Sequence, residues 1–139
     1  MSSATATGSC LCNSVAYSIT GVDKGPVLCH CSNCQKTTGS AFANNHRFMK
    51  AKLDITKGED KVNTYSDSNS ISGNTLLRHF CSQCGSPIYL ENSAFKGKGL
   101  YILYTGCMDG NMQHTKPAGE LFGHNRRGWF GGVEGAAKL

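Results

Sequence analysis

Three short clusters of cysteine constrain this 139-residue chain more than any other feature of its sequence. The clusters read Cys10-Leu11-Cys12, Cys29-His30-Cys31-Ser32-Asn33-Cys34 and Cys81-Ser82-Gln83-Cys84. Alternate residues of a strand point to the same face, so a C-x-C pair can offer two thiolates to one ion. In C-x-x-C the chain turns between the two ligands, and a following glycine permits a tight bend. The clusters therefore predict metal sites.

The segment before the first cluster indicates whether the chain is expected in an oxidising or a reducing compartment. Residues 1–7 are small and polar and lack the basic start and apolar run of a signal peptide. No apolar stretch approaches the length of a membrane span. We therefore expect a cytoplasmic protein that makes no membrane contact and whose reduced thiols bind metal rather than form disulfides. We expect residues 1–7 to be flexible and residues 8–139 to form a single zinc-binding domain.

The net charge of +5 comes from lysines and arginines that are scattered along the chain. Such a surface suits an acidic small ligand, and most of these side chains serve solubility. A nucleic-acid zinc ribbon pairs two C-x-x-C knuckles, and the C-x-C element breaks that pattern here. The sequence therefore argues against a nucleic-acid partner and leaves a homo-oligomer open.

The remaining pattern is that of a mostly β protein. Apolar and polar residues alternate over 15–19, and Leu100 to Tyr104 form the most apolar strand, which we expect to be central. Gly21 to Pro26 and the Ser/Asn-rich run Asp67 to Asn74 are predicted as loops. Cys34 to Thr38 is predicted as a single helical turn that Gly39 ends.

Counting the thiols suggests how they divide between sites. Zinc favours four tetrahedral ligands, and the C-x-C pair with the C-x-x-C pair makes one complete set. Three thiols remain, and three protein ligands with one open position are typical of a catalytic zinc. The complete set is Cys10, Cys12, Cys81 and Cys84, and the partial set is Cys29, Cys31 and Cys34. Counting alone leaves open a division in which Cys10 completes the second set.

Three motifs, taken in this order, resemble the glutathione-dependent formaldehyde-activating enzyme family, which also includes centromere protein V. They are Gly8-Ser9-Cys10-Leu11-Cys12, Cys29 to Lys36 followed by Gly39-Ser40, and Arg78 to Pro87. The resemblance runs from Gly8 to about Trp129. It implies an Mss4-like β-tent of twisted antiparallel sheets organised around zinc. It also implies two zinc ions per chain, a structural one at Cys10, Cys12, Cys81 and Cys84 and a catalytic one at Cys29, Cys31 and Cys34.

The resemblance implies a carbon–sulfur lyase of the S-(hydroxymethyl)glutathione synthase type. Its ligand would be glutathione or a glutathione conjugate, whose thiol binds at the open three-cysteine zinc. Lys36 and Arg47 are close in sequence to that site and are our candidates for binding glutathione. Many bacterial members carry Pro-x-x-His where this chain has Pro117 to Glu120.

The alternative is a non-catalytic, zinc-stabilised binding module for a protein or chromatin partner. It predicts a fourth protein ligand at the second cluster, a histidine or Cys107. His30 stands between two ligands of that cluster, and on a strand it would face away from the ion. We therefore expect His30 to be a packed or hydrogen-bonded residue.

At the C-terminal end of the chain, Trp129 and Phe130 are expected to anchor the tail.

Overall fold

The computed structural model describes residues 3–139, within which nine strands, one α-helix and five short 3₁₀ helices are found. The strands are β1 (Ser3–Ser9), β2 (Ala16–Cys29), β3 (Ala43–Lys57), β4 (Val62–Asp67), β5 (Leu76–Cys81), β6 (Pro87–Asn92), β7 (Tyr101–Tyr104), β8 (Gly119–Leu121) and β9 (Ala137–Lys138). The helices are α1 (Ser32–Thr38), η1 (Glu59–Lys61), η2 (Ser93–Phe95), η3 (Thr105–Cys107), η4 (Gly110–His114) and η5 (Gly123–Asn125). The prediction of a mostly β protein is confirmed.

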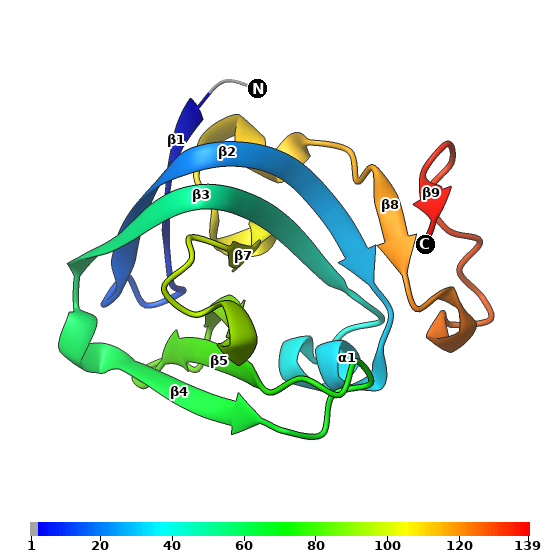
Figure 1. Ribbon diagram of the computed structural model, residues 1–139, viewed down its shortest axis with the longest axis horizontal. Helices are drawn as coiled ribbons and strands as arrows, with labels where there is room; N and C mark the ends of the chain where they lie inside the picture. Colours follow the sequence, from blue (N-terminus) through cyan, green and yellow to red (C-terminus); the bar gives the residue numbers. More distant parts are fainter. Residues whose placement is uncertain (1–2) are drawn as a thin grey trace.

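The strands form one open sheet in the order β4-β5-β6-β7-β3-β2-β8-β9, with β1 on the outer edge of β2. The strand β7 lies inside this order, as predicted for the most apolar strand. Two pairs, β2–β8 and β8–β9, are parallel, so the sheet is mixed rather than wholly antiparallel. Figure 1 shows β2 and β3 arching over β4 and β5, with α1 at one end of the space between them.

The long strand β2 corrects one prediction. Residues 21–26, predicted as a loop, belong to β2 and pair with β3 across register shifts at Thr20/Val22 and Asp23/Gly25. Gly25 takes a φ of 75°, a left-handed conformation that is open to glycine. The Gly and Pro residues therefore mark β-bulges that bend a continuous strand, and the bend gives β2 its arch.

The N-terminal strand corrects a second expectation. Residues 3–7, for which composition suggested a flexible segment, form most of β1 and pair with β2 from Ser3↔Val22 to Ser9↔Ala16. Residues 1 and 2 lie outside the part that the structure describes. Because β1 is held along its length, Cys10 follows directly from an ordered strand.

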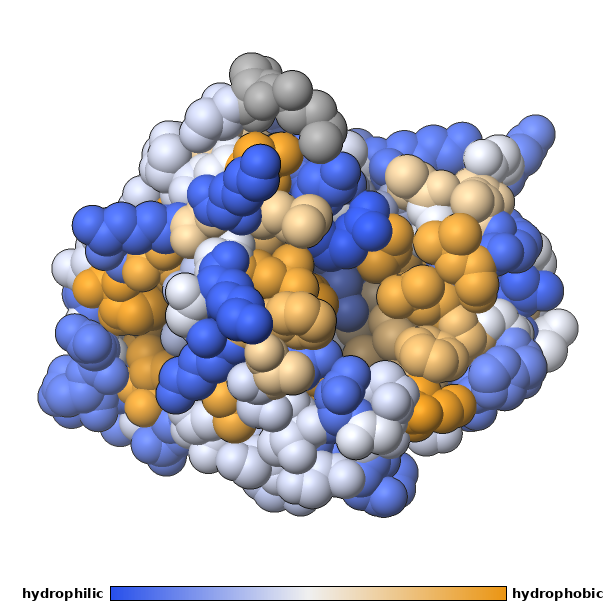
Figure 2. All heavy atoms as spheres, in the orientation of Figure 1, coloured by the Kyte–Doolittle hydropathy of each residue, from blue (hydrophilic) through white to orange (hydrophobic). Residues whose placement is uncertain are grey.

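Two apolar clusters fill the fold. The larger cluster includes Tyr17, Phe48 and Leu103, which are almost wholly buried. The smaller cluster packs Cys29, Cys31 and Cys34 with Ala43, Leu90 and Tyr104. On the face shown in Figure 2, apolar side chains gather around a hollow between α1 and β8. The second cysteine group is thus built into a small apolar core of its own.

The C-terminal tail is anchored by one of the two aromatic residues expected there. Phe130 stacks on Phe42 at 5.4 Å between ring centroids and also contacts the His30 ring at 6.0 Å. Trp129 is 77% exposed, so its predicted role as an anchor is wrong. Among residues 3–139, no helix has the length and apolar character needed to cross a membrane.

Candidate metal centres and the adjoining site

Four cysteines from distant parts of the chain converge at one end of the sheet. The first two follow β1, and the others lie at the end of β5 and in the turn after it. The four sulfurs lie within 4.8 Å of one another, with Cys10–Cys12 at 3.7 Å and Cys12–Cys81 at 3.8 Å. A tetrahedral zinc with Zn–S bonds of about 2.3 Å requires sulfurs roughly 3.8 Å apart. The group of Cys10, Cys12, Cys81 and Cys84 could therefore hold a metal ion.

Backbone N–H groups hold these thiols in place. The amides of Val15 and Gln83 donate to the sulfurs of Cys10 and Cys81, each at 3.3 Å. The turn closes through Gly85, whose N–H bonds the Cys81 carbonyl at 2.8 Å with a φ of 76°. Hydrogen bonds to sulfur favour the thiolate form, which is the form that binds metal.

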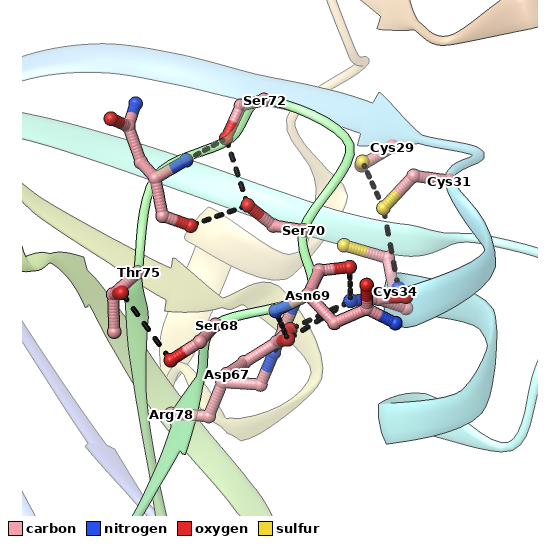
Figure 3. A network of polar contacts seen from close by, with 12 residues as sticks. Cys29, Cys31, Cys34, Asp67, Ser68, Asn69, Ser70, Ser72, Thr75 and Arg78 are labelled. Carbon is pink, nitrogen blue, oxygen red and sulfur yellow. Dashed lines mark hydrogen bonds and ion pairs between the residues drawn. The ribbon is translucent and has the colours of Figure 1, made fainter.

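The second group lies where β2 runs into α1. Cys29 ends β2, Cys31 is the N-cap of α1, and Cys34 stands in its first turn. The three side chains turn toward one another in Figure 3, and each is less than a tenth exposed. The Cys29 and Cys31 sulfurs are 3.5 Å apart, and all three lie within 4.8 Å. These three thiols could also hold a metal ion.

Hydrogen bonds favour a thiolate at Cys31. The Cys29 thiol donates to it, and the Cys34 backbone N–H does so at 3.3 Å. The Cys29 bond, followed by the interaction with the Cys34 thiol, lowers the pKa of Cys31 to about 2, although burial opposes the charged form. A buried thiolate of this kind is a ready ligand for a soft or borderline metal ion.

The structure thus divides the seven thiols as the count of zinc ligands suggested, into a complete set of four and a remainder of three, because Cys10 lies with the first group. No histidine, carboxylate or further cysteine of residues 3–139 joins the second group. Cys107 lies elsewhere and donates its thiol to the Pro87 carbonyl at 3.3 Å. Burial raises the pKa of Cys107 to about 11, so it is held as a neutral thiol. The fourth protein ligand expected for a binding module is therefore not seen in the described part of the chain.

His30 faces away from the three thiols, as predicted from strand alternation. Its Nε2 lies 2.8 Å from Glu120 Oε1, and both side chains are fully buried. The other carboxylate oxygen accepts the Val133 N–H at 3.0 Å and pairs with the Lys138 ammonium at 2.5 Å. Burial alone would raise the pKa of Glu120, but these partners, Lys138 first, lower it to about 2. Glu120 thus ties the tail to the segment between Cys29 and Cys31.

Arg78 is the cation of this site that sequence reasoning missed. It is 6% exposed on β5, donates Nε to Asp67 at 2.9 Å and donates Nη1 to the Tyr104 hydroxyl at 3.2 Å. Its charge favours the thiolate forms of Cys31 and Cys34. Burial opposes that charge, but Tyr104 and then Asp67 outweigh it and raise the pKa of Arg78. The local sequence of β5, in which the polar His79 stands beside Arg78, offered no signal for this role.

Asp67 corrects the prediction that its segment is an exposed loop. The residue ends β4, is 5% exposed, and accepts two bonds from the Asn33 amide at 2.9 and 3.0 Å. Burial would raise its pKa, yet Asn33 and then Arg78 lower it. Figure 3 shows this carboxylate beside Arg78, and the Ser/Asn-rich loop continues from it past the cysteines. Asp67 and Asn33 therefore join β4 to the helix that carries Cys34.

The two expected glutathione-binding cations lie in different settings. Lys36 is exposed on α1 and lines a cavity of 340 Å³ with Asn33 and Arg78. Arg47 lies on β3 and donates its guanidinium to the backbone carbonyls of Gly25 and Lys24, at 3.3 and 3.0 Å. The structure thus places Lys36 near the second cysteine group and ties Arg47 to the arch of β2.

A mostly β fold with one group of four thiols and another of three, each of which could hold a metal ion, defines a cysteine-rich class of protein. The chain belongs to the glutathione-dependent formaldehyde-activating enzyme family, whose sequence model matches residues 5–125. A crystal structure of a Rhodobacter sphaeroides protein has a similar fold, with a TM-score of 0.58 and 18% identity. That match covers 75% of this chain and 88% of the other, and at this identity it bears on the fold alone.

Proposed function

We propose that the protein is a zinc-dependent carbon–sulfur lyase or synthase that acts on a glutathione adduct. The substrate class is S-hydroxymethylglutathione or a related glutathione conjugate. The observation that carries the proposal is the group of Cys29, Cys31 and Cys34, which has three sulfur donors and no fourth among residues 3–139. Membership in a family described by glutathione-dependent formaldehyde activation supports the same reading.

The donor chemistry fits zinc at both groups, because thiolates are among the ligands that zinc takes in proteins. Cys10, Cys12, Cys81 and Cys84 would hold a structural ion, and Cys29, Cys31 and Cys34 would hold a catalytic one. A zinc ion with an open position favours the thiolate form of a coordinating thiol and polarises a carbonyl oxygen.

In the synthase direction a bond forms between the glutathione sulfur and the formaldehyde carbon. The carbonyl π bond breaks, and the thiol proton ends on the new hydroxyl oxygen, so atoms and charge balance. The lyase direction reverses each step. The site residues contribute a poorly hydrated setting for the sulfurs, since Cys29, Cys31 and Cys34 are each less than a tenth exposed. Electrostatic interactions are stronger in such an environment than in water.

Two further features support thiol binding at this group. Four thiolates around one zinc would carry excess negative charge, and Arg78 supplies a buried positive charge close to Cys31 and Cys34. The fully buried His30–Glu120 pair fixes the segment that presents Cys29 and Cys31. Lys36 is our candidate for a contact to a glutathione carboxylate, whereas the guanidinium of Arg47 already bonds two backbone carbonyls.

The test compares the wild type with Cys31→Ser and, as a matched control, Cys107→Ser, which alters a thiol outside both groups. Exchange NMR measures how fast glutathione and S-hydroxymethylglutathione interconvert. We expect acceleration by the wild type and by Cys107→Ser, and none by Cys31→Ser. Elemental analysis should find two zinc ions in the wild type and one in Cys31→Ser. Unchanged acceleration by Cys31→Ser would overturn the proposal.

A further inference from the structure

A trough runs between α1 and the strands β4 and β5. It consists of two neighbouring cavities of 340 and 280 Å³, both of which are lined by Thr37, Tyr65 and Arg78. We call the joined cavities the Arg78 trough. Their combined size lies in the range of small-molecule sites, which is about 300–1,000 Å³.

The Arg78 trough adjoins the second cysteine group from two sides. Tyr104 lines the smaller cavity and also packs against Cys29, Cys31 and Cys34 in the smaller apolar cluster. The helix α1, which carries Cys34, contributes Thr37 to both cavities and Lys36 to the larger one. A thiol ligand whose sulfur reaches the three cysteines would therefore have room for the rest of its length in this trough.

Arg78 lines both cavities, and one of its donors has no acceptor. Arg78 uses Nε on Asp67 and Nη1 on Tyr104, but its buried Nη2 has no hydrogen-bond partner among the described residues. Buried N–H donors are rarely left unpaired in folded proteins, because burial without an acceptor is costly. The guanidinium fork also matches the two oxygens of a carboxylate.

We propose that the Arg78 trough binds the non-sulfur part of a thiol ligand and that the Arg78 guanidinium receives a carboxylate of that ligand. The inference rests on the proposed function, because the ligand sulfur must bind at Cys29, Cys31 and Cys34. It assigns one carboxylate of the glutathione part to Arg78, and it makes Arg78 the residue that distinguishes thiols with a carboxylate at that position from thiols without one. Lys36, exposed at the larger cavity, supplies a second positive charge for an acidic peptide.

The test uses two thiols that differ only at the carboxylate, 3-mercaptopropionate and its methyl ester. Calorimetric titration of the zinc-loaded protein gives their dissociation constants. We expect the wild type to bind the acid at least about tenfold more tightly than the ester, the gain expected from one charge-assisted hydrogen bond. In the double variant Arg78→Gln/Asp67→Asn, the preference should fall to about onefold, and the ester should lose only the smaller part of its affinity that depends on the Arg78 charge beside the site sulfurs.

The double substitution removes both members of the buried ion pair, so that no lone charge is left inside the fold. Arg78→Lys, which keeps the charge but loses the fork, should retain part of the preference. Arg47→Gln is the matched control and should retain all of it, since that guanidinium bonds backbone carbonyls of β2. All variants are first checked for two zinc ions and for cooperative unfolding.

Three outcomes would overturn the inference, and they are distinguishable. A preference that survives in Arg78→Gln/Asp67→Asn would place the carboxylate elsewhere. An equal loss for the acid and the ester would mean that Arg78 acts on the site sulfurs alone. In both cases the proposed function stands. Failure of the wild type to bind any thiol, glutathione included, would overturn the proposed function as well.

Discussion

Glu120 offers a sharp test of how the second cysteine group is held. The substitution Glu120→Gln keeps the size of the side chain and one acceptor oxygen but removes its charge. The carboxylate has three partners, His30 at 2.8 Å, the Val133 N–H at 3.0 Å and Lys138 at 2.5 Å. The tail and the segment between Cys29 and Cys31 both depend on these bonds.

The expected loss in the free energy of unfolding follows from how deeply each contact of Glu120 is buried. Losing a buried hydrogen bond to a charged group costs about 1.5–3 kcal/mol, and because glutamine retains one acceptor oxygen but not the charge, we expect a loss of about 2–3 kcal/mol. The Lys138 contact contributes little of that cost, since its side chain is 50% exposed and surface pairs contribute roughly 0–1 kcal/mol. A loss of that size lowers the melting temperature by roughly 10 °C in a domain of this length.

Two assays measure the loss of stability and the loss of zinc affinity separately. Denaturant unfolding of the zinc-loaded protein gives the free energy of unfolding, and chelator competition gives the zinc affinity of the weaker site. Residues that orient metal ligands typically change metal affinity about 10–100-fold when mutated, and we expect a loss in that range at the three-cysteine group. The control Lys138→Met should cost no more than about 1 kcal/mol. If Glu120→Gln matched the wild type in both assays, the assignment of Glu120 as the holding residue would be refuted.

Three further predictions concern separate parts of the fold. Cys84→Ser should release one zinc ion and destabilise the protein strongly, whereas Cys107→Ser should release none, as elemental analysis and unfolding would show. Gly58→Ala should cost about 1–3 kcal/mol in thermal unfolding, because Gly58 has a φ of 73° and a Cβ would overlap a backbone carbonyl of the loop before β2. Asp67→Asn should be less stable than the wild type at neutral pH. The lowered pKa of Asp67 means that its contribution is complete above about pH 3.9, the value for an unfolded aspartate, and is lost as the pH falls through the folded value. Urea unfolding at a series of pH values should therefore show the two proteins converging in acid, and a constant difference would contradict this.

The cysteine groups that could hold metal were predictable from sequence because the spacing within each cluster is local. The close spacing within C-x-C and C-x-x-C keeps both sulfurs of a pair near each other without knowledge of the rest of the fold, although Cys10 and Cys12 lie in a turn after β1 and not on the extended segment that alternation suggested. Completeness then suggested which pairs combine, and the structure brings Cys10, Cys12, Cys81 and Cys84 together. His30 was placed correctly by the same strand alternation.

The errors arose where long-range pairing overrides a local signal. The glycines and proline of 21–26 predict a turn, but β3 pairs on both sides of Gly21 and Lys24, so the strand continues through the segment with two bulges. Asp67 reads as the start of a polar loop, yet Asn33 and Arg78, 34 and 11 residues away, draw it into a buried network. No local pattern encodes such partners, so the role of Arg78 emerged only from the fold.

The proposed function depends most on the three-cysteine group having no fourth protein ligand among residues 3–139. The most direct test is a crystal structure of the zinc-loaded protein with glutathione, with data collected at the zinc absorption edge. We predict two anomalous peaks, one among Cys10, Cys12, Cys81 and Cys84 and one among Cys29, Cys31 and Cys34. The glutathione sulfur should be the fourth ligand of the second ion. A fourth ligand from the protein at that ion, with glutathione absent, would contradict the account.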